Sequence, residues 1–273
     1  MRPRPRTGED RRVSEPEQPG RALIEAGAPV AGSMCAAAAA LVFGSSSGAV
    51  QVDPRLAACL RAAAAEAAPI SIPRERVRAG AVLAFAVEHS ITVARSGRQL
   101  RTDAFFVGRP GTRPAVGEVL EGIVTAARLS ADERRVRHLG YLLAEAAYST
   151  DVDAELVSRT LRLAEPLSWR QLAILAGVGR RDRLPLPMTP MDDDPAGWNA
   201  WAAREDVADL QRVGLLDPPV AVPRGGAAAL PRLRLADLRL TRRGVLVHRL
   251  LVLDVLRDDA VADALADLGL PRS

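Results

Sequence analysis

Side chains that act as nucleophiles or metal ligands are few in this chain and widely spaced. The 273 residues include three histidines, His89, His138 and His248, and two cysteines, Cys35 and Cys59. Zinc ligands usually come as closely spaced pairs of Cys or His, and the sequence contains no such pair. We therefore expect no metal site. The cysteines are expected to be buried or free thiols of a protein in a reducing compartment.

Two short strings suggest chemistry, but each has a simpler interpretation. The string GSSSG at 44–48 matches the nucleophile elbow G-x-S-x-G, which needs a strand before it and a helix directly after it in an α/β sheet. Pro54 follows closely and no alternating strands are apparent, so we interpret the string as a flexible link. The run 192–194 (DDD) suggests a divalent cation, but Pro195 directly after it favours a helix start.

Arginine is the only strongly basic residue in the chain. The 37 Lys+Arg residues are all arginine, set against 33 acidic residues, for a net charge of +4. Without lysine, Schiff-base chemistry and a phosphate-loop lysine are excluded. The sequence thus offers no catalytic residues and no cofactor site, and we expect a non-enzymatic protein. Only 3% of residues are aromatic, so the core must consist of Ala, Leu and Val.

The first 52 residues divide into two parts. Residues 1–25 combine proline with mixed charges and are expected to be a disordered tail. Residues 26–52 are uncharged and rich in Ala and Gly, and this stretch is long enough to span a membrane. Pro29 and the serines of the GSSSG string interrupt this stretch. We favour a buried or loosely ordered segment, with membrane insertion and export as alternatives.

Periodic apolar residues predict a helical domain over residues 53–149. Asp53-Pro54 predicts a helix start, and Pro73 opens a longer helix that Gly97 closes. A strongly amphipathic helix follows from about residue 116. Ser130 and Glu133 have the spacing of a capping box, which predicts a helix from there to about Tyr148.

The last part of the chain, residues 150–273, has a different organisation. Helices are predicted at 152–164, from Asp194-Pro195 to Gly214, after the cap Thr241, and at 258–268. A further helix is predicted at 169–176, capped by Ser168 and ended by Gly177 and Gly179. Leu233 to Leu240 alternates like a strand, with one slip. Trp198 and Trp201 have helical spacing, which favours core packing; an exposed partner-binding patch is the alternative.

This order of elements resembles a winged-helix module. The residues that carry the resemblance are 209–216 (DLQRVGLL) and 238–246 (LRLTRRGVL). The longer stretch 72–256 is similar to uncharacterised bacterial helical proteins, including those of the abortive-infection alpha type. That resemblance implies a helical body joined to a winged-helix-like end, and a role in phage defence. It supplies no catalytic residues.

The charge of the winged-helix-like module is divided between two regions. The helix that would enter a DNA groove, residues 198–213, has two arginines against three acidic residues. The region 217–243 has six arginines against two aspartates. Phosphate contacts therefore suit the wing and not the helix, which favours protein contacts over DNA. The candidate contacts to nucleic acid or a partner are Arg232, Arg234, Arg239, Arg242 and Arg243.

These observations predict a mainly α protein: a helical body followed by a winged-helix-like α+β module. We expect a cytoplasmic interaction protein whose partner is another protein or a second copy. A DNA-binding regulator and a membrane-associated effector acting through residues 26–52 are the alternatives.

Overall fold

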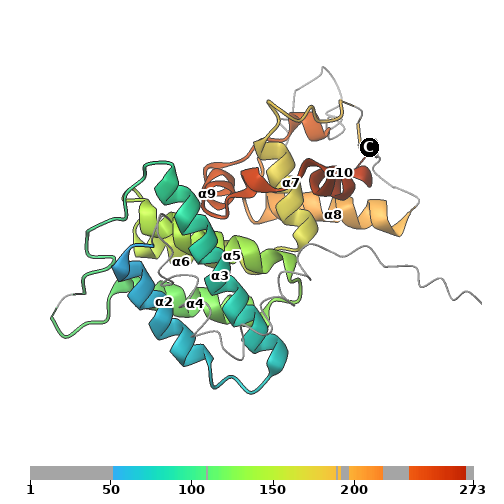
Figure 1. The fold of residues 1–273 in the computed structure, drawn as a ribbon. Coiled ribbons are helices and arrows are strands. Elements are labelled where there is room, and N and C mark those ends of the chain that lie inside the picture. Colours follow the sequence, from blue (N-terminus) through green and yellow to red (C-terminus); the bar gives the residue numbers. More distant parts are fainter. Residues whose placement is uncertain (1–51, 109, 189, 192–196, 218–233, 269–273) are drawn as a thin grey trace, which may run out of the picture.

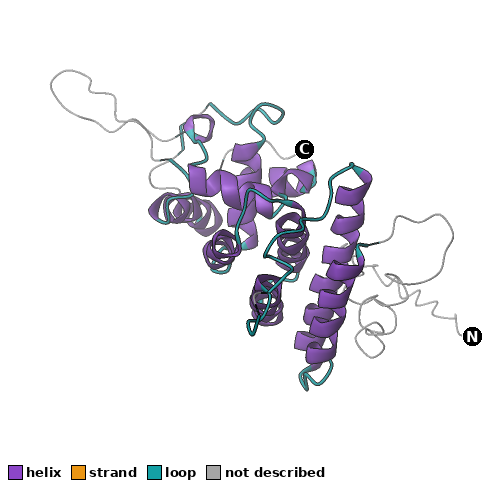
Figure 2. Ribbon diagram, turned by 90° about the vertical axis from the view of Figure 1, so that its left-hand side faces the viewer, coloured by secondary structure: helices purple, strands orange, loops and turns teal. Residues whose placement is uncertain are grey.

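The computed structural model describes residues 52–108, 110–188, 190–191, 197–217 and 234–268, which form helices joined by turns and loops (Figures 1 and 2). No strand occurs among these residues, so the expectation of a mainly helical fold is confirmed. The tail 1–25, the segment 26–51 and the GSSSG string lie outside them. The helices are α2 (Pro54–Ala67), α3 (Pro73–Arg95), α4 (Ala115–Leu129), α5 (Arg134–Tyr148), α6 (Ala154–Ala164), α7 (Trp169–Gly179), α8 (Trp198–Arg212), α9 (Arg242–Leu250) and α10 (Asp258–Ala266), with 3-10 turns η1 (Leu235–Asp237) and η2 (Leu253–Val255).

The helices α3 and α5 form the centre of a first group, and α2, α4 and α6 pack around them (Figure 1). Nearly every residue of α5 is buried. A Cβ at Gly140 of α5 would lie 2.6 Å from the carbonyl oxygen of Val82 and 2.7 Å from the Cβ of Phe85, both in α3. The missing side chain therefore lets the two helix backbones approach closely, as small residues do at tight helix contacts.

A second group consists of α7, α8, α9 and α10, with α7 in contact with the other three (Figure 1). We predicted that Gly177 and Gly179 end α7, and this was wrong, because the helix continues through Gly179. Both glycines are packing positions. A Cβ at Gly177 would lie 2.8 Å from Leu265 of α10, and a Cβ at Gly179 would overlap the ring of His248 in α9.

The strand predicted over Leu233–Leu240 is not formed in the described part of that segment. Residues 235–237 form the turn η1, and pairing is limited to isolated antiparallel bridges, Leu216 with Leu240 and Pro190 with Arg234. The reason is the slip in the alternation: Leu235 and Leu238, three residues apart, are both fully buried. A 3-10 turn places residues i and i+3 on one side, whereas a strand does not.

The G-L-L string at 214–216 and the L-T-x-x-G string at 240–244 contact each other where α8 ends and α9 begins. Gly214 ends α8 with a φ of 72°, in the left-handed region. The hydroxyl of Thr241 accepts a hydrogen bond from Gly244 N at 3.0 Å, which caps α9, and donates one to the Gly214 carbonyl at 2.6 Å. A Cβ at Gly244 would overlap the carbonyl oxygen of Leu215, so these positions constrain one another.

Helix starts follow the predicted capping residues with two exceptions. One is α8, which begins at Trp198 with Gly197 as its N-cap, so the start predicted at Asp194-Pro195, which lies outside the described residues, was wrong. Asp53 caps α2 by accepting from Arg55 N at 2.9 Å, and Ser168 forms a full capping box with Gln171 at α7. The capping box predicted at Ser130 was wrong, because α5 begins only at Arg134. Asp132 accepts from Arg134 N at 3.0 Å instead, while Ser130 is the C-terminal cap of α4.

One helix of the described residues, α3, is long and apolar enough to cross a membrane by length and composition. Within its most apolar window, 56% of the residues are buried inside the protein, against neighbours that include α5 and α4. A buried core helix satisfies the same criteria of length and composition, so this finding is weak evidence for a membrane span.

The close approach at Gly140 predicts a large effect of a single methyl group. Gly140→Ala is expected to lower the free energy of unfolding by about 1–3 kcal/mol, because the new Cβ meets backbone atoms of α3 that cannot move aside. Urea denaturation followed by circular dichroism measures this. In the control Gly117→Ala the methyl meets only the side chain of Arg113, so a change within about 0.5 kcal/mol is expected. Equal effects of the two substitutions would contradict the packing argument.

Candidate functional site

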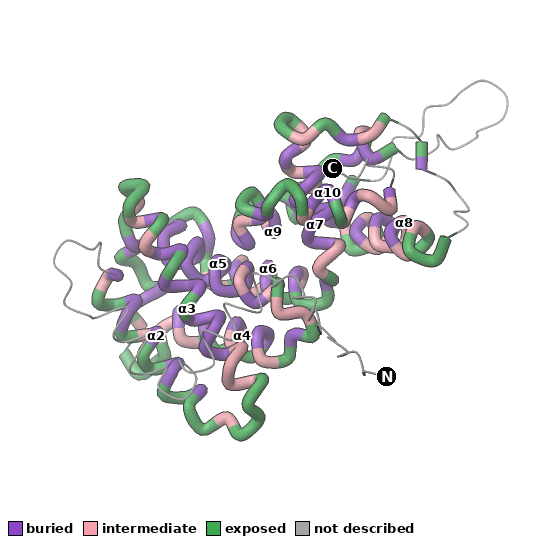
Figure 3. The backbone as a smooth tube through the Cα atoms, turned by 45° about the vertical axis from the view of Figure 1, so that its right-hand side comes forward, coloured by how far each residue is buried: buried purple, intermediate pink, exposed green. Residues whose placement is uncertain are grey.

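Two tryptophans lie exposed at the N-terminal end of α8. Trp198 is 85% exposed and Trp201 is 48% exposed, and one end of α8 is marked as exposed in Figure 3. Their rings pack edge to face, with centroids 6.1 Å apart at 87°. The core packing that we favoured for them is therefore wrong, and the alternative of a surface patch fits. Exposed large aromatic residues in a cluster typically mark interaction sites.

The reason for this exposure is the orientation of α8. Its buried residues, Ala203, Val207 and Leu210, recur at three- and four-residue spacing and are fully buried. The helix is held on α7, with which it is in contact, by an ion pair of Arg170 and Asp206. The opposite side of α8, which we call the outer stripe, follows from the 3.6-residue period. It consists of Trp198, Trp201, Glu205, Asp209 and Arg212.

Arginine covers the faces of most other aromatic rings in the described chain. Arg134 lies over Trp169 at 4.9 Å, Arg101 over Phe105 at 4.5 Å, and similar contacts reach Phe85, Phe106 and Tyr141. Such cation–π contacts stabilise a buried or half-buried ring. Within the residues that the structure describes, Trp198 and Trp201 have no guanidinium over them.

The predicted arginine contacts form a separate surface at the start of α9. Arg234, Arg239, Arg242 and Arg243 are exposed, and Arg232 lies outside the described residues. Arg239 donates to the carbonyls of Ala236 and Leu238 at 2.7 and 2.8 Å. Among the described residues, the other three have no carboxylate partner. Arg243 lies at the C-terminal end of α8, near Gly214, so the structure does not bring this surface together with the Trp pair.

An ionic cluster around the buried carboxylate of Glu145 links α3 and the residues after it to α5, and nothing in the sequence pattern indicated it. The Glu145 carboxylate accepts from His89 Nε2 at 2.9 Å and from Arg98 at 2.9 and 3.0 Å. Burial raises the pKa of Glu145, but these hydrogen bonds lower it more, so its pKa lies below the ordinary value. His89 and Arg98 lie 56 and 47 positions before Glu145, so no local spacing could have revealed the cluster.

A buried arginine, Arg101, organises the loop after α5. The side chain of Arg101 is 5% exposed and donates to the carbonyls of Ala146, Ser149 and Val152, and it pairs with Asp103 at 2.6 Å. This guanidinium satisfies C-terminal carbonyls of α5 that have no helical partner. The polar groups of the Glu145 cluster and of Arg101 form contacts with neighbouring side chains or with the backbone, so none is left to contact a substrate.

The two groups of helices meet through polar contacts to α9 and the residue after it. His138 of α5 donates from Nδ1 to the carbonyl of Leu251 at 2.8 Å. Arg249 of α9 pairs with Asp151 at 2.6 Å. Burial lowers the pKa of His138 from 6.5 to about 4, against a smaller raising effect of the hydrogen bond, so the ring is neutral at pH 7.

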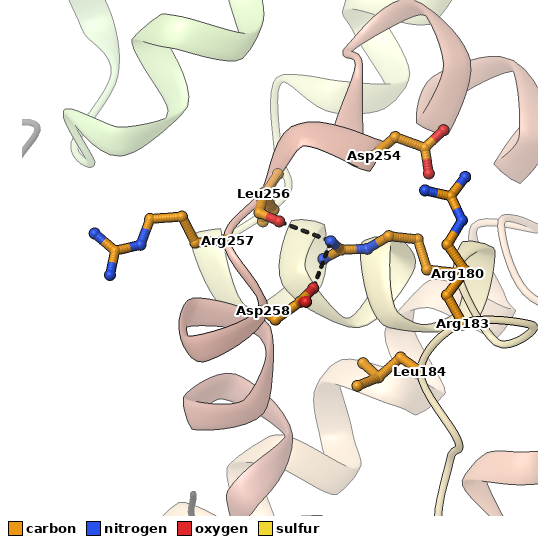
Figure 4. Close-up of a pocket in the computed structure, with 7 residues that line it drawn as sticks. All are labelled: Arg180, Arg183, Leu184, Asp254, Leu256, Arg257 and Asp258. Carbon is orange, nitrogen blue, oxygen red and sulfur yellow. Dashed lines mark hydrogen bonds and ion pairs between the residues drawn. The ribbon is translucent and has the colours of Figure 1, made fainter.

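A pocket of about 340 Å³ lies between the end of α7 and the start of α10 (Figure 4). Arg180, 6% exposed, donates to the Leu256 carbonyl at 2.7 Å and pairs with Asp258 at 3.0 Å. Its Nη2 atom is buried without a hydrogen-bond partner. Arg257 points away from Arg180 (Figure 4) and pairs with Asp259. The arginine thus joins α7 to the start of α10, and its role here is structural.

No group of three or more His, Cys, Asp or Glu residues in the described part of the chain has a geometry that could hold a metal ion. Cys59 is a free thiol, half-buried in α2, and burial raises its pKa. Cys35 and the run 192–194 lie outside the described residues. No family model, curated protein or solved structure matches this chain.

Burial of a neutral His138 makes stability depend on pH in a defined direction. The unfolded chain takes up a proton near pH 6.5 and the folded chain only near pH 4, so stability is lost as pH falls through this window. Between pH 7 and pH 5 this amounts to about 2 kcal/mol. His138→Gln keeps an N–H donor but does not titrate, so its free energy of unfolding should fall less over that range. Parallel pH profiles of the two proteins would contradict the assignment.

Proposed function

We propose that this chain is a non-enzymatic intracellular interaction protein. Its C-terminal helices form a winged-helix-like module that binds a protein partner through the outer stripe of α8. The observation that carries the proposal is the exposed, edge-to-face pair of Trp198 and Trp201. Tryptophan is among the residues that most often dominate the energetics of protein interfaces.

The surroundings of the Trp pair support a protein partner. The pair lies on a rigid helix whose other face is fully buried, so little ordering is needed on binding. The helix carries more acidic than basic residues, which disfavours approach to phosphates. The order of α7, α8, the Leu216–Leu240 bridge and α9 supports the winged-helix-like assignment.

The polar clusters of the protein support binding in place of catalysis. His89, Glu145 and Arg98 satisfy one another, and His138 is committed to a backbone carbonyl. A general base or nucleophile would need a free atom beside a space for substrate. In the described residues these histidines offer neither.

The proposal predicts a loss of binding without a loss of stability. A photo-cross-linking residue with an aromatic ring, such as benzoylphenylalanine, keeps a large ring at position 198 and, in cells that produce the chain, should give a specific protein adduct. Trp201→Ala in the same chain should abolish the adduct, because it removes half of the anchor. The same residue at position 129, where Leu129 is 67% exposed, is the control and should give no such adduct.

The stability of the variants provides the necessary check. The double variant Trp198→Ala, Trp201→Ala should have a free energy of unfolding within about 1 kcal/mol of the wild type, because Trp198 is exposed and the half-exposed Trp201 packs partly on Trp198. Absence of any protein adduct at position 198 would refute the proposed function.

DNA binding is the second candidate, favoured by the exposed Arg234, Arg242 and Arg243. If duplex DNA is the partner, affinity should fall steeply with salt, and Arg242→Ala with Arg243→Ala should weaken it at all sequences. Absence of duplex binding at low ionic strength removes this candidate.

Phage defence, which only the sequence resemblance supports, is the biological setting that we propose for the interaction. Plaque counts in cells that produce the wild type or the variant without the Trp pair test this setting.

A further inference from the structure

We infer that two copies of this chain associate through α8 packed antiparallel, with Trp198 of each copy stacked on Arg212 of the other. The inference rests on the proposed function, because it names the protein that covers the Trp pair. Two observations carry it: the spacing of the outer stripe and the order of its side chains.

The spacing of the outer stripe is the same from either end. Its five members are separated by three, four, four and three residues, centred on Glu205. A second α8 in the opposite direction therefore places stripe residue against stripe residue along the whole helix. Packing of this kind, with three- and four-residue steps, is the usual geometry of paired helices.

The chemistry of the facing residues is complementary. Reversal about Glu205 brings Trp198 opposite Arg212 and Trp201 opposite Asp209. Arg212 and Asp209 form an ion pair with each other along the same helix. Arg212 is 68% exposed, and a guanidinium that is paired at its edge can still stack its face on a tryptophan ring. The Asp209 carboxylate, 43% exposed, has a second oxygen that can accept from the indole N–H of Trp201.

Arginine covers five other aromatic rings in the described chain, so the second copy would supply the contact that the Trp pair lacks. The association is symmetric, with two identical Trp–Arg contacts, and closes as a dimer. A second copy is therefore favoured over an unrelated partner, since both halves of the interface lie on this helix.

Two features determine how strongly the proposed dimer is expected to associate. A contact between two 15-residue helices is small, at the low end of specific interfaces, below about 1,200 Å². In addition, the two Glu205 carboxylates meet at the symmetry axis and repel. The dimer is therefore expected to form at micromolar concentrations and to be tightened when this charge is removed.

Analytical ultracentrifugation of the full chain, from about 1 to 200 µM, tests the inference. Trp198→Ala and Arg212→Ala should each weaken dimerisation at least about tenfold, equivalent to about 1.4 kcal/mol. Glu205→Gln should strengthen it severalfold. Leu129→Ala and Arg162→Ala, which change exposed residues of α4 and α6, are controls and should leave it unchanged.

Mixing the two weakened variants gives the sharpest test. In a mixed dimer, Trp198 of the arginine variant meets Arg212 of the tryptophan variant, so one of the two contacts is intact. An equimolar mixture should therefore associate more tightly than either variant alone. A non-specific apolar contact of Trp198 does not predict this rescue, because such a contact does not require Arg212 of the other copy.

Two results would overturn the inference: a wild-type chain that is monomeric at 200 µM, or a mixture that associates no better than its components. A monomeric chain that still cross-links to another protein from position 198 overturns the dimer and leaves the proposed function standing. A monomeric chain with no adduct removes both.

Discussion

The contact between α3 and α5 is the constraint on which most of this structure depends. Gly140 allows the helix backbones to touch, and the buried cluster of His89, Glu145 and Arg98 fixes their rotation relative to one another. A buried carboxylate is stable only when its hydrogen-bonding capacity is filled, so the cluster admits few alternative packings. With α5 fixed in this way, His138 presents its ring to Leu251 and so positions the end of α9.

The second group of helices is organised around a different principle, which is the absence of side chains at contact points. Gly177 receives α10, Gly179 receives His248, and Gly244 receives the carbonyl of Leu215. At each glycine a neighbouring group packs directly against the backbone, in the space that a Cβ would occupy. Gly177 and Gly179 lie in α7, which therefore supports the other helices of the group. The small and aliphatic residues of α8 pack against α7, so its tryptophans lie on the opposite, exposed side of the helix.

Sequence reasoning recovered the features that depend on local chemistry. The caps at Asp53, Ser168 and Thr241 were predicted because a hydroxyl or carboxylate bonds to an amide two or three residues away. Features that depend on distant contacts were not recovered. Gly177 resembles a helix end, and only the position of Leu265 shows that it is a packing site. Trp198 and Trp201 resemble core residues because their spacing is helical, and spacing alone does not reveal which face is turned outward.

The contact glycines also bear on how relatives of this protein can be found. A Cβ at Gly140 or Gly244 would meet backbone atoms, which move aside less easily than the side chains that face Gly177 and Gly179, so substitution is most costly at the first two positions. Distant homologues should therefore retain glycine at 140 and 244 after most other similarity has been lost. A search profile weighted on that spacing would detect ancestry that overall sequence identity conceals.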